Sequence, residues 1–121
     1  MLIPLLSVRG GSKAIEFYKA AFDAEVLFRM EEEPLIAQLS IYGQQFWLSD
    51  ESPEFHNFSP ETLHGSTVRL MLIVDNPDVV FANAVEAGAL VVWHVENQSY
   101  RWRLGRLVDP FGHHWEIGKP L

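Results

Sequence analysis

Apolar residues follow two patterns along this chain. They alternate with polar residues in short stretches, and they recur every three to four residues in two longer stretches. Residues 2–8 form a short apolar run that ends at two glycines, and residues 13–22 then carry one apolar stripe at helical spacing. Ser12 stands where a helix N-cap is expected. Three alternating stretches follow and predict strands at 25–30, 35–41 and 45–49. The first part of the chain therefore predicts the order βαβββ.

The second part of the chain repeats this order. Residues 67–74 again form an apolar strand, and Asn76 with Pro77 predicts the start of a helix that ends near Gly88. Superposing Leu5 on Met71 places one predicted helix on the other, which indicates a duplicated module. The remaining pattern predicts a strand at 90–95, a loop at 96–101, a turn at Asp109-Pro110-Phe111-Gly112 and a strand at 113–117.

Residues 53–65 separate the two repeats and contain prolines and serines without sustained periodicity, so we expect a linker there. The predicted fold is α+β, one domain over residues 1–121 with module 1 at 1–52 and module 2 at 66–121. Two such modules, each a curved mixed sheet with a helix on one face, would leave their other faces around a cleft.

Composition and charge exclude several classes of function. With 48% hydrophobic and 21% charged residues, the 121-residue chain is typical of a globular domain. Its formal charge of −7 and lack of a basic run argue against a nucleic-acid partner. No apolar stretch approaches the ~20 residues of a membrane span, and the first residues do not resemble a signal peptide, so we expect a cytoplasmic protein. The absence of cysteine excludes disulfides, thiolate ligands and a cysteine nucleophile.

Three stretches carry a resemblance to a known family: VRGGSKAIEFYKAAFDAE, VDNPDVVFANAVEAGA and GRLVDPFGHHWEI. They resemble the vicinal oxygen chelate superfamily, which includes glyoxalases, bleomycin resistance proteins, fosfomycin resistance proteins and extradiol dioxygenases. The resemblance is closest to the branch described as PhnB-like. It implies the glyoxalase/bleomycin resistance fold, a small-molecule cleft between paired modules, and a homodimer.

Members of this superfamily that use a metal place up to four ligands on strands lining the cleft, and the resemblance puts these places at Ile3, Gln38, Arg69 and Glu116. Ile3 has no donor atom, Gln38 is a weak neutral donor, and Arg69 is a permanent cation. Only Glu116 is a good ligand. We therefore expect no metal or other cofactor, and we expect Arg69 to lie within ion-pair distance of Glu116.

Strand alternation gives an independent prediction of the cleft. With those four places facing inward, Ser40, Met71 and His114 face inward too, while the opposite face is almost wholly apolar. His113 then faces away from His114, so the two cannot bind one ion together without a bulge. The predicted cleft residues are Gln38, Ser40, Arg69, Met71, His114 and Glu116.

Two kinds of function stay open at this point. A binding protein would hold a small, partly aromatic or cationic compound, with Glu116 binding or neutralising it. A glyoxalase-type lyase, isomerase or transferase would use Glu116 as general base or metal ligand, with His114 or Arg69 holding an oxyanion. The departures from the metal pattern favour a metal-free cleft and leave open whether it catalyses a reaction. The aromatic residues serve either ligand stacking or core and interface packing: Trp47, Trp93, Tyr100 and Trp102.

Overall fold

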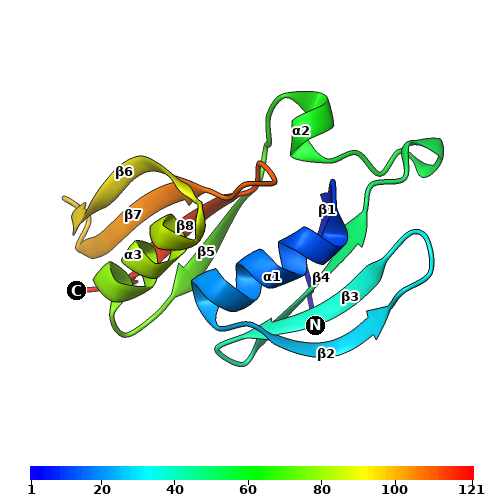
Figure 1. The fold of residues 1–121 in the computed structure, drawn as a ribbon. Helices are drawn as coiled ribbons and strands as arrows, with labels where there is room; N and C mark the ends of the chain where they lie inside the picture. Colours follow the sequence, from blue (N-terminus) through cyan, green and yellow to red (C-terminus); the bar gives the residue numbers. More distant parts are fainter.

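Two four-stranded mixed sheets, each with a helix on one face, make up the computed structural model, which describes residues 1–121 (Figure 1). Module 1 contains β1 (Leu5–Val8), α1 (Gly11–Phe22), β2 (Glu25–Met30), β3 (Ile36–Ile41) and β4 (Gln44–Asp50). Its strand order is β1-β4-β3-β2, with β1 parallel to β4 and the other pairs antiparallel.

Module 2 has the same topology. It contains β5 (Arg69–Ile73), α3 (Pro77–Ala87), β6 (Leu90–Asn97), β7 (Trp102–Val108) and β8 (His114–Pro120). Its strand order is β5-β8-β7-β6, and β5 is parallel to β8 as β1 is to β4. The predicted α+β fold of two βαβββ units is confirmed. The predicted loop at 96–101 is shorter than expected, because β6 continues to Asn97.

The two main helices begin in different ways. For α3 the prediction is confirmed, because Asn76 Oδ1 accepts a hydrogen bond from Val79 N at 3.4 Å and Pro77 takes the first helical position. For α1 it is wrong, because the helix begins at Gly11 and Ser12 already lies in its first turn. The Gly11 amide instead donates to Asp50 Oδ1 at 2.7 Å, so a side chain from the end of β4 replaces a local cap.

The linker is not a plain loop, contrary to the prediction. It contains a 3-10 turn, η1 (Pro53–Phe55), and one turn of α-helix, α2 (Pro60–Leu63). Ser59 caps α2 by accepting a hydrogen bond from Thr62 N at 3.2 Å. A single helical turn is too short to show a 3.6-residue period, so hydrophobic patterning could not reveal it.

The main core lies between the sheets and the two helices. In Figure 1 α1 and α3 lie on the same side of the two sheets, and they pack against each other. Aromatic rings join the modules there, with Trp115 of β8 at 4.9 Å from Phe22 of α1, measured between ring centroids. None of the helices combines the length and apolar character needed to cross a membrane. The predicted apolar face is confirmed, with buried residues including Leu6, Val8, Ala37, Leu39, Ile41, Leu72, Val74 and Trp115.

Candidate functional site

The sheet faces that turn away from the helices are open in the single chain. Alternation along β1 and β5 leaves Leu5, Met71 and Ile73 facing outward from the core, with 63%, 53% and 56% of their surfaces exposed. We call these surfaces the concave face of module 1 and the concave face of module 2. The predicted inward residues lie on them, so the alternation argument assigns these side chains correctly.

A charged group occupies the concave face of module 2. Glu116 on β8 lies in register between Met71 of β5 and Arg106 of β7, and Arg69 lies in register with His114. The Arg69 Nε atom is 3.5 Å from Glu116 Oε2, which confirms the predicted ion pair. Glu116 is only 8% exposed, so this carboxylate sits at the floor of the face and Arg69 covers it from the rim.

Two polar groups of this face have no partner in the chain. The Nε atom of Arg106 and the Nδ1 atom of His114 are both buried without a hydrogen bond. Burial, and next the charge of Arg106, lower the pKa of His114, which therefore stays neutral at neutral pH. Arg106 is not among the predicted cleft residues, although pairing β7 with β8 across the Asp109 turn would have placed it opposite Glu116.

The concave face of module 1 is uncharged in its central strands. Gln38 of β3 donates to Gln45 Oε1 at 2.7 Å, and Trp47 of β4 lies beside Phe28 with ring centroids 6.0 Å apart. Trp47 pairs with Leu5 in the way Glu116 pairs with Met71, since both pairs join the parallel strands of their sheets. Trp47, and not Gln38, is therefore the counterpart of Glu116, and Gln38 is the counterpart of Arg106.

The single chain does not bring the six predicted cleft residues into one cavity. Gln38 and Ser40 lie on one sheet, whereas the other four lie on the second sheet. A cavity of about 490 Å³ between the modules includes Met71 but none of the other five. A larger one of about 710 Å³, between β1, the linker and β5, includes none of them.

The residues at the expected metal position do not fit a metal. No group of three or more His, Cys, Asp or Glu side chains is gathered anywhere in the chain. Ile3 precedes β1 and lacks a donor atom, and Trp47 takes the place symmetrical to Glu116. The one carboxylate is beside the guanidinium of Arg69, which would repel a cation. Metal-free function stays a prediction, but the donor set offers one good ligand where about three are needed.

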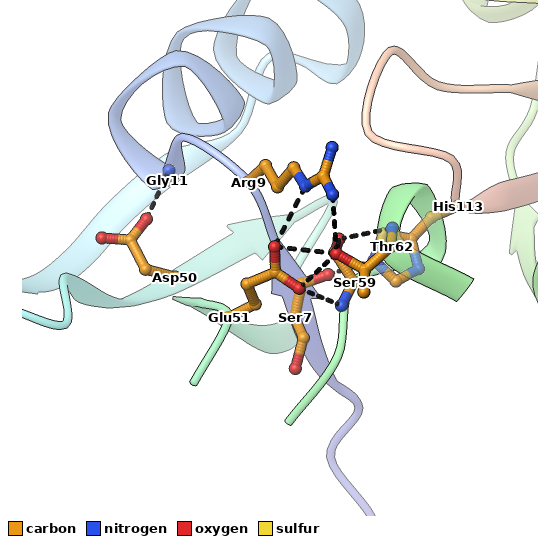
Figure 2. Close-up of polar contacts among 8 residues, drawn as sticks. All are labelled: Ser7, Arg9, Gly11, Asp50, Glu51, Ser59, Thr62 and His113. Carbon is orange, nitrogen blue, oxygen red and sulfur yellow. Dashed lines mark hydrogen bonds and ion pairs between the residues drawn. The ribbon is translucent and has the colours of Figure 1, made fainter. Parts of the chain in front are cut away.

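A second polar cluster fastens the linker to module 1 (Figure 2). The Glu51 carboxylate accepts hydrogen bonds from Arg9 Nε at 3.0 Å, Ser59 N at 3.0 Å and Thr62 Oγ1 at 2.7 Å. These contacts, with the Ser59 backbone bond the largest cause, lower the pKa of Glu51 to about 2. Because every polar group here has an internal partner, the cluster is a structural clasp and not a ligand site.

A buried aspartate joins the two modules. Asp109, 3% exposed in the turn between β7 and β8, accepts hydrogen bonds from Tyr18 Oη of α1 at 2.5 Å and Trp115 Nε1 at 2.9 Å. It also accepts from the backbone amides of Phe111 and His113, at 2.9 and 3.0 Å. Burial, and next the charge of Asp109, raise the pKa of Tyr18. The sequence pattern predicts the turn at Asp109 but not this link between the modules.

Known proteins resemble this chain in sequence and in structure. No protein-family model matches the chain. The uncharacterized protein Mb0911c of Mycobacterium bovis is 38% identical over 126 residues, covering 99% of this chain and 83% of that protein. The solved structure of the Arabidopsis thaliana gene product At5g48480 is 28% identical with a TM-score of 0.79, covering 98% of both chains.

Two further structures share the fold at lower identity. One is a member of the glyoxalase/bleomycin resistance protein/dioxygenase superfamily from Sphaerobacter thermophilus, 18% identical with a TM-score of 0.73, covering 98% of this chain and 97% of that one. The other is TnmS3, an antibiotic binding protein from Streptomyces, 21% identical with a TM-score of 0.74, covering 100% and 97%. The fold is therefore that of the glyoxalase/bleomycin resistance protein/dioxygenase superfamily. Within that fold, the chain belongs to the same family as mycobacterial Mb0911c.

Proposed function

We propose that this protein binds a small organic molecule between the concave face of module 2 and the concave face of module 1, without a catalytic metal. The observation that carries the proposal is the group of polar side chains on the open face of module 2. Arg106 and His114 have buried atoms without partners, and exposed Met71 and Ile73 lie nearby on the same face. A few polar groups among apolar ones are typical of a small-molecule site.

The proposed cleft is completed by a second copy of the chain. Each concave face is open in one chain, and exposed apolar residues also lie on the strands β2 and β6 at the sheet edges, among them Phe28 and Leu90. In a symmetric homodimer, module 1 of one copy would face module 2 of the other and form two equal clefts. That arrangement would bring Gln38 and Ser40 opposite Arg69 and Glu116, as the predicted cleft requires.

Binding is favoured over catalysis by the contacts of Glu116. Its carboxylate is held by Arg69, and no hydrogen bond joins it to His114 or to another group that could exchange a proton. The antibiotic-binding function in the description of TnmS3 supports binding as a use of this fold. The PhnB-like branch and the cytoplasmic location are proposed on the sequence resemblance and composition alone.

Native mass spectrometry and sedimentation test this proposal together. We expect a dimer at micromolar concentration and a small molecule that copurifies with it or is taken up from a compound library. Met71→Trp should fill the cleft and abolish uptake. Val79→Trp is the control, because Val79 is similarly exposed but lies on α3, outside both concave faces. A monomer, or uptake that survives Met71→Trp, would contradict the proposed cleft.

A further inference from the structure

The concave face of module 2 carries two guanidinium groups on a chain of formal charge −7. Arg69 and Arg106 share this face with Glu116, which is directly opposite Arg106 on the neighbouring strand, and with Glu96 of the edge strand β6, which is in register with Leu104. His114 adds a neutral ring and no negative charge. Glu116 is paired with Arg69, so Arg106 is left without a paired carboxylate on this open face.

Arg106 differs from the other part-buried arginines of this protein. The Nε atom of Arg29 is also buried without a hydrogen bond, but Arg29 forms an ion pair with Glu31 at 2.5 Å, and Arg103 pairs with Asp78 at 2.7 Å. Arg106 forms neither an ion pair nor a hydrogen bond in the chain, and its Nε atom is buried. A half-buried guanidinium without an acceptor is costly, so an acceptor from outside the chain would gain the full benefit of its N–H groups.

We infer that the ligand of this site is an organic anion whose carboxylate is bound by Arg106, a more specific statement that rests on the proposed function. A planar guanidinium matches a carboxylate with two parallel hydrogen bonds. The exposed side chains of Met71 and Ile73 suit an apolar body, and Trp47 with Phe28 on the facing module suits an aromatic one.

This inference changes the role expected for Glu116. The sequence suggested that Glu116 would neutralise a cationic ligand. In the structure its charge is already taken up by Arg69 at 3.5 Å, so a cationic ligand would have to displace Arg69 and would still meet Arg106. Glu116 is better described as a positioning residue that holds Arg69 over the face.

Three probes of the same shape and different charge test the inference: benzoate, benzamide and benzylamine. Their binding to the purified full chain is measured by NMR titration of the tryptophan and arginine side-chain signals. We expect benzoate to bind about tenfold or more tighter than benzamide, because charge-assisted hydrogen bonds exceed neutral ones by roughly that amount, and benzylamine to bind weakest.

Paired variants locate the effect. Arg106→Gln should weaken benzoate binding about tenfold or more, and Arg106→Lys should recover part of it because the charge returns without the fork geometry. Arg103→Gln is the matched control, since it removes the same charge from the same strand but pairs with Asp78 of α3 outside the concave face. It should leave benzoate binding unchanged.

The outcomes separate this inference from the proposed function. If benzamide or benzylamine binds as well as benzoate and Met71→Trp still blocks binding, the cleft stands and the anion preference is wrong. If Arg106→Gln dissociates the dimer and leaves benzoate binding intact, the acceptor for Arg106 is a carboxylate of the second copy, and the inference is again wrong. If no probe binds the wild-type face, both the inference and the proposed cleft fail.

Discussion

The concave faces of the two modules follow the same strand register but differ in their chemistry. Arg106 on module 2 corresponds to Gln38 on module 1, and Glu116 corresponds to Trp47. Gln38 satisfies its own hydrogen bond through Gln45, whereas Arg106 has no partner in the chain. One backbone thus supports uncharged, partly aromatic central strands in one copy of the module and charged central strands in the other.

This difference separates what the fold needs from what the site needs. The apolar faces that pack against α1 and α3 are alike, with Leu6 and Leu72 buried at equivalent places on β1 and β5. Charge on the central strands of a concave face is therefore not required to form a βαβββ unit, since module 1 forms without it. The proposed binding function would account for Arg69 and Arg106, which the formation of a βαβββ unit does not require.

The largest expected effect comes from breaking the link that holds the two faces in their relative positions. Asp109→Ala removes the acceptor of four hydrogen bonds, two of them from Tyr18 and Trp115. Leaving buried donors without partners should lower the free energy of unfolding by about 3–5 kcal/mol. Urea denaturation measures this loss. Tyr18→Phe, which removes one donor only, should cost about 1 kcal/mol, and equal losses in the two variants would show that Asp109 is not the hub.

The clasp at the linker gives the next effect and depends on pH. The pKa of Glu51 is about 2 in the folded protein and lies near 4.5 when free, so its contacts stabilise the fold above pH 4.5 and this contribution disappears as the pH falls towards 2. Glu51→Gln should cost about 1–2 kcal/mol at pH 7 and almost nothing near pH 2. Thermal unfolding of both proteins across this range measures the difference. A gap that stays constant with pH would contradict the role given to the carboxylate.

Making the two faces alike at one position should change the free energy of unfolding less, and in the opposite direction. Arg106→Gln places on module 2 the residue that module 1 has at Gln38, and it removes a half-buried charge without a partner. We expect the free energy of unfolding to stay the same or to rise by up to about 1 kcal/mol. Arg103→Gln, which breaks the exposed ion pair with Asp78, should instead lower it slightly. A clear loss of stability in Arg106→Gln would show that this arginine supports the fold.

The sequence pattern predicted the fold because both spacings of apolar residues, alternation in strands and three to four residues in helices, follow from which side chains are buried. Alternation along β1 and β5 identified the outward residues Leu5 and Met71, and the pattern placed α1 and α3 within two residues of their observed bounds. Capping of α1 by Asp50 was beyond this reasoning, since β4 lies far from α1 in the sequence. Hydrophobic periodicity indicates how residues within one helix or strand are buried, but it does not predict contacts with side chains from another element.

The candidate site was predicted only in part, because the sequence pattern indicates which face a side chain lies on but not which partners it has. Glu116 and its ion pair with Arg69 followed from strand alternation and family resemblance. Arg106 was missed because its importance lies in the absence of a partner, which only the packed structure reveals. Trp47 was left unassigned because the register of β3 and β4, in which it pairs with Gln38, decides its face.

The smallest expected effect concerns metal binding, and it tests whether Arg69 is what distinguishes this face from a metal site. Arg69→His removes the cation beside Glu116 and supplies an imidazole at the same place. Two ligands are still fewer than a catalytic metal needs, so we expect affinity for Ni²⁺ or Zn²⁺ to rise by only about tenfold, or about 1.4 kcal/mol. Calorimetry and elemental analysis measure this gain. Gln38→His is the control on the neutral face and should give none. Stoichiometric metal in the wild-type protein, lost in Glu116→Ala, would overturn the metal-free site and put catalysis ahead of binding.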